Sequence, residues 1–254
     1  MSKCCLGVVF GSRTCEHEVS IISALQMMKA ADRQLYDVVP IYISPKGVWY
    51  TGEPLMELNA YTPFDETRKG IQRVTLDLTP GSGALLAVEP PKGLFGKEKQ
   101  QVVARLDCVV PVMHGMHGED GTLQGLLELA DIPYTSSGVA ASAIGMDKVI
   151  MKQFFQGGGY PVVPGVWYTR SHFEKNEQPV LDEIESKLGY PVFVKPAMLG
   201  SSIGVSKARN RDELLRALKD GFDYDRKVLI EKGIEHPIEL NCSVLGFDDD
   251  VQAS

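Results

Sequence analysis

The stretch from Pro191 to Val205 constrains the fold of this chain more than any other. It opens with a short apolar run, Pro191 to Val194, which predicts a buried strand that ends at Lys195. Pro196 then stops the hydrogen bonding of the strand, because proline has no N–H to donate. A loop of small residues follows, whose N–H groups can approach a ligand closely: Gly200, Ser201, Ser202 and Gly204.

A fixed cation beside several close N–H donors is what a polyanion such as the phosphates of a nucleotide requires. A plain hairpin with a glycine turn and a solvated lysine fits the same residues equally well. A second apolar run, Lys227 to Ile234, carries Glu231 and Lys232 at its end and favours the phosphate interpretation. The order Val-Lys-Pro, glycine-serine loop, helix and Leu-Ile-Glu-Lys resembles the ATP-grasp superfamily. There, two lysines hold the phosphates and the Glu-Lys strand lines the adenine pocket.

The composition limits the classes of partner. With 254 residues the chain can bury a large core and form more than one domain. The net charge is −7 without a block of Lys and Arg, which argues against nucleic acid or an anionic membrane as the main partner. The five cysteines are odd in number and form no Cys-x-x-Cys pair, so neither a disulfide framework nor a zinc site is indicated. With no signal-like or membrane-spanning apolar run, a reduced cytoplasmic protein is expected.

The first part of the chain predicts an open α/β domain. Leu6 to Phe10 reads as a strand, and a glycine loop and a helix with apolar residues from Ile21 to Ala31 follow it, as at the start of a Rossmann-like half. One glycine is too few for a dinucleotide fingerprint, so NAD is not predicted. Glu16 lies in the loop at the carboxyl end of the strand, where open α/β sheets bind ligands. Glu18 is better explained as a partner of the helix dipole.

Further strands and helices follow from the same patterns. Strands are predicted at Val38 to Ser44 and Leu106 to Met113, and a helix at Thr122 to Ala130. Residues 49–93 are rich in proline and glycine and predict irregular loops with at most a small hairpin, and 93–100 predicts an exposed loop tip. We expect the sheet of this domain to be parallel.

The segment from His114 to Gly125 concentrates chemistry in one turn. Two histidines and two acids stand among glycines at 115, 118 and 121. A metal site and a solvated loop with capping acids are the alternatives. A metal site is disfavoured, because no second cluster accompanies the loop, and no metal ligand is assigned.

The second half predicts a helix at Ala140 to Phe155 with Met146-Asp147-Lys148 inside it, where Lys148 alone would be read as a solvated lysine. Glycines at 157–159 end that helix. The remaining predicted elements are strands at 162–168 and 239–245, the latter opening a new sheet, and helices at 180–188 and 212–218.

Four motifs in order make the chain similar to the D-alanine-D-alanine ligase family: Glu16 to Ser20, His114 to Gly125, Gly145 to Lys148, and Val194 to Pro196 with the glycine-serine loop. The resemblance implies that ATP phosphorylates one D-alanine and that the amine of a second attacks the acyl phosphate, for peptidoglycan precursor synthesis. It also implies Mg²⁺ on the phosphates and, commonly, a homodimer. The fold it implies is α/β, with a Rossmann-like N-terminal domain (1–136), a central α+β ATP-grasp subdomain (137–231) and the start of an incomplete C-terminal subdomain (232–254).

The resemblance also implies roles for single residues. Glu16 would hold the ammonium of the first D-alanine, Ser201 would fix Glu16, and His114 would lie near the D-alanine carboxylate and the acyl phosphate. Lys148 and Lys195 would bind phosphates beside Ser202 of the loop. The adenine site would be lined by Glu231, Lys232 and Ile234, and Glu239 would accept from the ribose hydroxyls.

Family members continue for roughly another third of their length, with the magnesium ligands and the loop that selects the second substrate. The resemblance therefore implies that a chain ending at Ser254 is not a competent ligase by itself. A nucleotide-binding module without chemistry is the alternative of another class. Within the enzyme class, D-lactate or D-serine as second substrate stays open.

Overall fold

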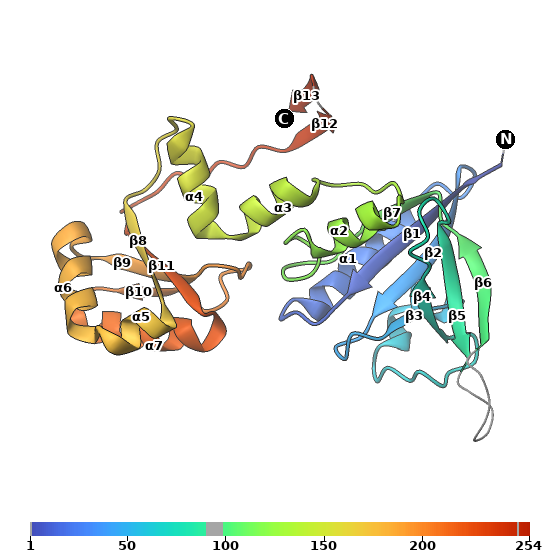
Figure 1. Ribbon diagram of the computed structural model, residues 1–254, viewed down its shortest axis with the longest axis horizontal. Helices are drawn as coiled ribbons and strands as arrows, with labels where there is room; N and C mark the ends of the chain where they lie inside the picture. Colours follow the sequence, from blue (N-terminus) through green and yellow to red (C-terminus); the bar gives the residue numbers. More distant parts are fainter. Residues whose placement is uncertain (1, 90–98, 248) are drawn as a thin grey trace.

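The computed structural model describes residues 2–89, 99–247 and 249–254, which form two lobes with separate sheets (Figure 1). The first lobe holds a seven-stranded sheet of order β6-β5-β4-β3-β2-β1-β7, and the second a four-stranded sheet of order β10-β9-β11-β8. A two-stranded hairpin, β12-β13, ends the chain.

Three parallel strands form the centre of the first lobe: β1 (Cys4–Gly11), β2 (Tyr36–Ile43) and β7 (Cys108–Pro111). Strand β1 is buried on both faces from Leu6 onward, as its continuous apolar run predicts. Helix α1 (His17–Ala30) lies along β1, and Met28 joins the core on one face of the sheet. Helix α2 (Thr122–Leu129) contributes Leu127 to the core on the other face.

The prediction of a wholly parallel sheet was wrong, and so was the prediction of irregular loops over 49–93. Four antiparallel strands extend the sheet: β3 (Trp49–Thr51), β4 (Gln72–Leu76), β5 (Ala84–Glu89) and β6 (Lys99–Arg105). Between β3 and β4 lie two short 3₁₀ helices, η1 (Glu53–Met56) and η2 (Leu58–Ala60). The prolines and glycines of the turns between these strands dominate this part of the sequence and concealed the strands. The loop tip expected at 93–100 lies outside the described residues, except that residues 99 and 100 begin β6.

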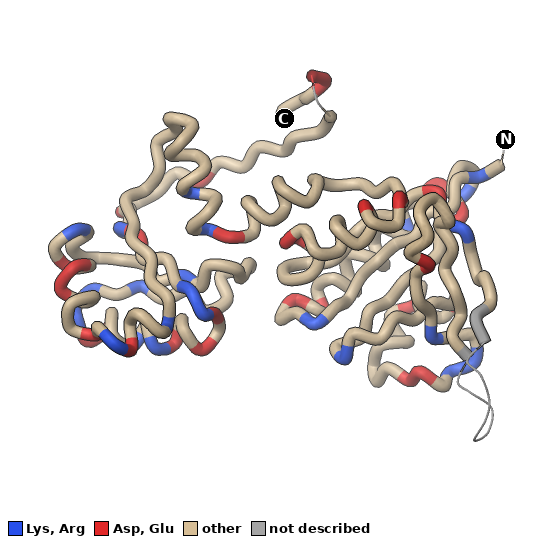
Figure 2. The backbone as a smooth tube through the Cα atoms, viewed as in Figure 1, with Lys and Arg blue, Asp and Glu red and all other residues tan. Residues whose placement is uncertain are grey.

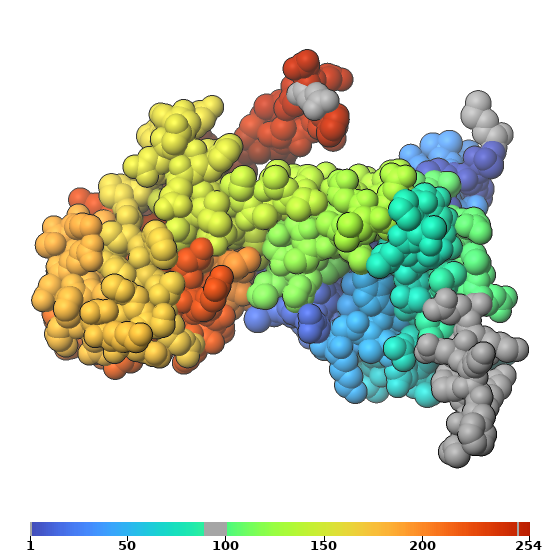
Figure 3. All heavy atoms as spheres, viewed as in Figure 1, coloured from blue at the N-terminus to red at the C-terminus, as the bar shows by residue number. Residues whose placement is uncertain are grey.

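The single helix predicted for 140–155 is two helices, α3 (Val139–Met146) and α4 (Lys148–Gly157). In Figure 3 the yellow-green to yellow atoms of this segment run from the first lobe to the second. Asp147 separates them with an extended backbone, φ −87° and ψ 103°. Its carboxylate accepts hydrogen bonds from the N–H groups of Val149 (3.0 Å) and Ile150 (3.2 Å), so it caps α4. An aspartate at this position offers the backbone an alternative to helix continuation, which explains the break.

The second lobe packs helices against one antiparallel sheet. Its strands are β8 (Gly165–Thr169), β9 (Val192–Pro196), β10 (Ser206–Ala208) and β11 (Lys227–Lys232), and its helices are α5 (Arg170–Lys175), α6 (Glu177–Leu188) and α7 (Arg211–Tyr224). Ile184 of α6, Leu218 of α7 and Val194 of β9 share its core and are fully buried. The apolar stripes of α6 and α7 explain why they cover the sheet.

Two strand predictions in the second lobe were wrong in their limits. Pro196 does not stop the pairing, because it is still opposite Val228 and the N–H of Ala197 continues the ladder to the Lys227 carbonyl at 3.0 Å. The strand expected at 239–245 begins only at β12 (Val244–Phe247), which pairs with β13 (Asp250–Ala253). In the described part of the chain, residues 239–243 have no neighbouring strand, and a strand needs a partner for its backbone groups.

No helix of the described residues has both the length and the apolar character needed to cross a membrane.

Candidate functional site

A cavity of about 870 Å³ opens in the second lobe between β9, the loop that follows it, β11 and the segment after β11. All seven residues predicted to bind the nucleotide line it: Lys148, Lys195, Ser202, Glu231, Lys232, Ile234 and Glu239. Ser201 lines it as well, whereas Glu16 and His114 do not. The structure therefore brings the predicted residues together as two groups, with Ser201 common to both.

Two cations of the cavity come from different elements. Lys148 is the first residue of α4, and its ammonium donates to the Leu199 carbonyl of the glycine-serine loop. Burial lowers the pKa of Lys148, and the neighbouring charge of Lys195 lowers it further. An anion placed in the cavity would offset both effects, which makes the pair suited to bind phosphate.

Glu231 is held by two lysines at the back of the cavity. Lys195 lies 2.5 Å from one carboxylate oxygen, and the Lys152 ammonium contacts the other. Burial opposes ionisation of Glu231, but the hydrogen bonds and charges of Lys152 and Lys195 outweigh it, so the pKa of Glu231 lies below its ordinary value. Sequence reasoning missed Lys152. Its spacing from Lys148, one helical turn, is a signal that could have found it.

Apolar groups form another part of the same cavity. Phe193, Val163 and Ile234 line it, and the Lys207 ammonium lies 5.6 Å from the centre of the Phe193 ring. Phe193 and Lys207 were not predicted either, because alternation along a short strand does not show which face meets a cavity. A cavity with cations beside apolar walls can hold a planar ring and its phosphates together.

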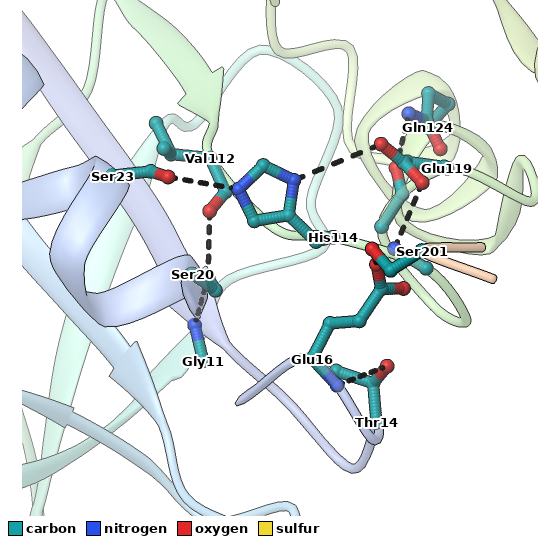
Figure 4. Close-up of polar contacts among 12 residues, drawn as sticks. Gly11, Thr14, Glu16, Ser20, Ser23, Val112, His114, Glu119, Gln124 and Ser201 are labelled. Carbon is teal, nitrogen blue, oxygen red and sulfur yellow. Dashed lines mark hydrogen bonds and ion pairs between the residues drawn. The ribbon is translucent and has the colours of Figure 1, made fainter. Parts of the chain in front are cut away.

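Glu16 lies where both lobes meet, at the N-terminal end of α1, and is 8% exposed. The Ser201 hydroxyl of the second lobe donates to its carboxylate (Figure 4). Gly115, in the left-handed region at φ +72°, leaves the space that the carboxylate occupies, because a Cβ there would overlap Oε2 of Glu16. A Cβ on Gly200 would lie 3.3 Å from Oε1. The carboxylate is thus enclosed by loops from both lobes.

His114 follows β7 and is oriented by two side chains. Its Nε2 lies 2.9 Å from the Ser23 hydroxyl, and its Nδ1 lies 3.9 Å from a Glu119 oxygen (Figure 4). Glu119 in turn accepts from the N–H of Gly115 at 2.8 Å. Sequence reasoning did not select Ser23, which lies on α1.

Buried polar side chains hold these loops in place. The Ser20 hydroxyl donates to the Val112 carbonyl at 2.6 Å and accepts from the Gly11 N–H at 2.8 Å, so it ties α1 to the ends of β1 and β7. His17 Nδ1 lies 2.7 Å from the Ser12 carbonyl and donates to it, because a carbonyl can only accept. In the neutral ring, Nε2 then accepts from the Tyr42 hydroxyl at 3.1 Å. Among the described residues, no group of three or more His, Cys, Asp or Glu side chains is arranged to hold a metal ion.

Two family models match the chain: the D-ala D-ala ligase N-terminus over residues 5–137 and the D-ala D-ala ligase C-terminus over residues 154–254. The chain belongs to the D-alanine-D-alanine ligase family. The resemblance read from its four motifs is confirmed, and so is the predicted fold class, an α/β domain followed by an ATP-grasp domain.

Members of the D-alanine-D-alanine ligase family align with nearly the whole chain. The D-alanine--D-alanine ligase of Geobacillus thermodenitrificans is 40% identical over 97% of this chain and 65% of its own length. That of Heliobacterium modesticaldum is 42% identical over 98% and 64%. The chain thus spans just under two thirds of the length of these relatives.

Solved structures give the same result. The D-alanine-D-alanine ligase from Coxiella burnetii superposes with a TM-score of 0.80 at 30% identity, covering 99% of this chain and 69% of that one. The VanG D-Ala:D-Ser ligase from Enterococcus faecalis does so with a TM-score of 0.80 at 31% identity, covering 99% and 68%.

Proposed function

We propose that the protein joins two D-alanine molecules at the expense of ATP, through an acyl phosphate, to supply D-alanyl-D-alanine for peptidoglycan precursors. One observation carries the proposal. The loop that contributes Ser201 and Ser202 to the cation-lined cavity also delivers the Ser201 hydroxyl to the buried Glu16 carboxylate. A single loop therefore adjoins a place for phosphates and a place for a substrate ammonium.

The cavity fits ATP in chemical character. Lys148 and Lys195 would bind the phosphates, and the N–H groups around Ser202 would add donors. Lys232 and Ile234 would line the adenine, together with Glu231, and Glu239 would accept from the ribose hydroxyls. Because Lys195 contacts Glu231 at 2.5 Å, the lysine would change partner when phosphate enters.

The first D-alanine would lie against Glu16. A buried carboxylate held by Ser201 favours a primary ammonium, since an unpaired charge at this place is costly. His114 would approach the carboxylate of this D-alanine and later the acyl phosphate. Ser23 and Glu119 would orient its ring.

The chemistry needs little beyond placement and charge. A carboxylate oxygen of the first D-alanine forms a bond to the γ-phosphorus, and the bond from phosphorus to the β,γ-bridging oxygen breaks to release ADP. The amine of the second D-alanine then attacks the acyl carbon, phosphate leaves, and the amine loses a proton. Lys148 and Lys195 would neutralise the phosphoryl oxygens, and Glu16 and His114 would hold the acceptor in line.

Mg²⁺ belongs to this proposal, because it commonly neutralises the phosphates of ATP in phosphoryl transfer. The described residues offer no ligand set for it, so we assign no step to the ion. A homodimer is also proposed. The exposed apolar side chains of Val19 and Ile22, neighbours on one face of α1, offer a contact surface. A cytoplasmic location, where ATP is available, completes the proposal.

D-Serine and D-lactate are the alternative second substrates. The curated relatives at 40–42% identity named above are D-alanine--D-alanine ligases, whereas the D-Ala:D-Ser ligase is 31% identical. D-Alanine is therefore the preferred second substrate. Mass spectrometry of the product formed from ATP and an equal mixture of D-alanine, D-serine and D-lactate tests the choice.

The decisive experiment changes Glu16→Gln in a polypeptide of full family length. Glu18→Gln is the matched control, because Glu18 is exposed in the first turn of α1, two residues further on. We expect a raised KM for the first D-alanine and an unchanged affinity for ATP, since only the ammonium contact is lost. Glu18→Gln should leave both constants unchanged. Equal kinetics of the two variants, or absence of D-alanine-dependent ADP release in the unmodified protein, would refute the proposal.

A further inference from the structure

A second cavity, of about 280 Å³, lies in the first lobe and shares no lining residue with the nucleotide cavity. It is lined from the loops that follow the three parallel strands: Ser12 and Arg13 after β1, Lys46 after β2 and His117 after β7. The carboxyl ends of parallel strands are where open α/β sheets bind ligands. The cavity is therefore placed as a binding site, although none of the residue roles implied by the family resemblance lies in it.

The polar lining consists of hydrogen-bond donors. Arg13, Lys46 and His117 contribute nitrogen groups, and no aspartate or glutamate lines the cavity. The Arg13 side chain lies against the turn of the other loop, because a Cβ on Gly47 would be 3.3 Å from its Cδ. Figure 2 shows the Lys and Arg positions of the first lobe in blue along its backbone. Such a lining selects an anion.

Ser12 supplies an independent observation. It is 3% exposed and has a positive φ of 87°, an uncommon conformation for a residue with a side chain. Its N–H donates to the Ile43 carbonyl at 2.7 Å and its carbonyl accepts from His17 at 2.7 Å. Its hydroxyl has no hydrogen-bond partner within the described part of the chain, and the residue lines the cavity. The positive φ thus places a hydroxyl without a protein partner at the cavity wall, where it can donate to a bound anion.

The remaining wall is apolar, with Ile43, Trp49 and Leu126 in it. Trp49 and Leu126 also line a neighbouring cavity of about 330 Å³, whose further lining includes Val74 and Leu76. An occupant can therefore place a charged head among the loop donors and an apolar tail against the indole.

We propose that this cavity binds a small carboxylate with an apolar tail, its carboxylate held by Ser12, Arg13 and Lys46 and its tail by Trp49 and Leu126. A guanidinium matches a planar carboxylate with two parallel hydrogen bonds, and the apolar wall favours a tail over a fully solvated anion such as phosphate.

The position gives the site a regulatory character. Arg13 precedes Glu16 by three residues, and His117 follows His114 by three. A carboxylate bound between these loops would fix both of the residues proposed to hold the first D-alanine. This regulatory effect rests on the proposed function, but the binding itself does not, so the two can fail separately.

The test uses the two tryptophans, Trp49 in the cavity and Trp167 in the other lobe, as reporters on this chain. In ¹⁵N-¹H NMR spectra each gives an indole N–H signal, which a Trp→Phe variant assigns. Titration with hexanoate should shift the Trp49 signal saturably and leave the Trp167 signal in place. The uncharged isostere hexanamide should bind at least about tenfold more weakly, because it cannot form the charged contacts.

Variants complete the test. Arg13→Gln should weaken hexanoate binding about tenfold, since it removes one charge-assisted contact. Arg105→Gln, the same change at an arginine that donates to the Ser82 carbonyl, should have no effect. Ser12→Gly removes the hydroxyl, relaxes the positive φ and should also weaken binding. A static Trp49 signal, equal binding of hexanamide or inorganic phosphate, or full affinity in Arg13→Gln would overturn the proposal.

Discussion

The Asp147 carboxylate makes two kinds of contact at the start of α4. Replacing it should greatly lower the urea concentration at which this region unfolds. One oxygen caps α4 through the N–H groups of Val149 and Ile150, and the other contacts the Lys227 ammonium of β11. The side chains of Asp147 and Lys227 are 7% and 17% exposed, so the pair is largely removed from water. Asp147→Ala would leave the helix uncapped and the lysine buried without its partner.

The size of the effect follows from these two contributions. Loss of an N-cap costs about 0.5–2 kcal/mol, and removing one partner of a buried ion pair costs about 3–5 kcal/mol. The two losses share one carboxylate and are not additive, so we expect about 3–5 kcal/mol for Asp147→Ala. Asp147→Ser keeps a capping oxygen but not the charge, and it should recover about 1 kcal/mol of this loss.

Urea unfolding measures these differences. Trp167 reports on the region, because the Lys227 ammonium lies 5.9 Å from the centre of its ring, and Trp49→Phe removes the other tryptophan signal. Lys227→Met in both backgrounds completes a double-mutant cycle, whose coupling energy isolates the ion pair. A loss below about 1 kcal/mol for Asp147→Ala, or a coupling energy near zero, would show that the buried pair does not stabilise the fold.

Three further predictions concern the site. Lys148→Ala and Lys195→Ala should each weaken binding of an ATP analogue by about 1–3 kcal/mol in calorimetric titrations, and unchanged affinity in both would remove the phosphate role. Gly115→Ala should raise the KM for the first D-alanine, because its Cβ, at a positive φ, would overlap the Glu16 carboxylate that we propose binds the substrate. Gly125→Ala, with nothing within 4 Å of the new Cβ, should instead stabilise α2 by about 0.5–1 kcal/mol. The pKa of Glu231 is lowered from 4.5, so its ionised form stabilises the fold above that value and this stabilisation is lost as the pH falls through the folded pKa. Glu231→Gln should therefore show a smaller fall in unfolding free energy between about pH 5 and pH 3 than the unmodified chain.

The parts of the fold that the sequence predicts well are those with one dominant physical signal. Strand β1 is an unbroken apolar run, and α7 has an apolar stripe, so both could be placed from periodicity. Strand β3 has only three residues, Trp49 to Thr51, and is stabilised by its neighbours β2 and β4 rather than by its own pattern. No local rule reveals such a strand, because its partners are distant in sequence.

The candidate site divides in the same way. The motif residues were selected through the family resemblance, because Lys148 by its own pattern reads as a solvated lysine, and the structure places it with Lys195 at one cavity. The spacing from Lys148 indicates Lys152 but not its contact with Glu231, which is 79 residues away and depends on how α4 lies relative to β11. The break at Asp147 was missed because the apolar pattern continues across it and conceals the capping role of the aspartate.

The contact between Lys195 and Glu231 has a consequence for how a nucleotide enters. Lys195 already has Glu231 as its counterion, so on binding a polyanion it would exchange the carboxylate for a phosphate group rather than gain a first anionic partner. The carboxylate it displaces stays beside Lys152, so its charge remains compensated. Binding should then release fewer counterions from the lysines into solution than their number suggests. The affinity for ATP should therefore fall less steeply with ionic strength than the affinity of a cluster of lysines without carboxylate partners. By the same reasoning the cavity should bind free phosphate weakly, so selectivity for a nucleotide would depend on the proposed adenine and ribose contacts as much as on charge.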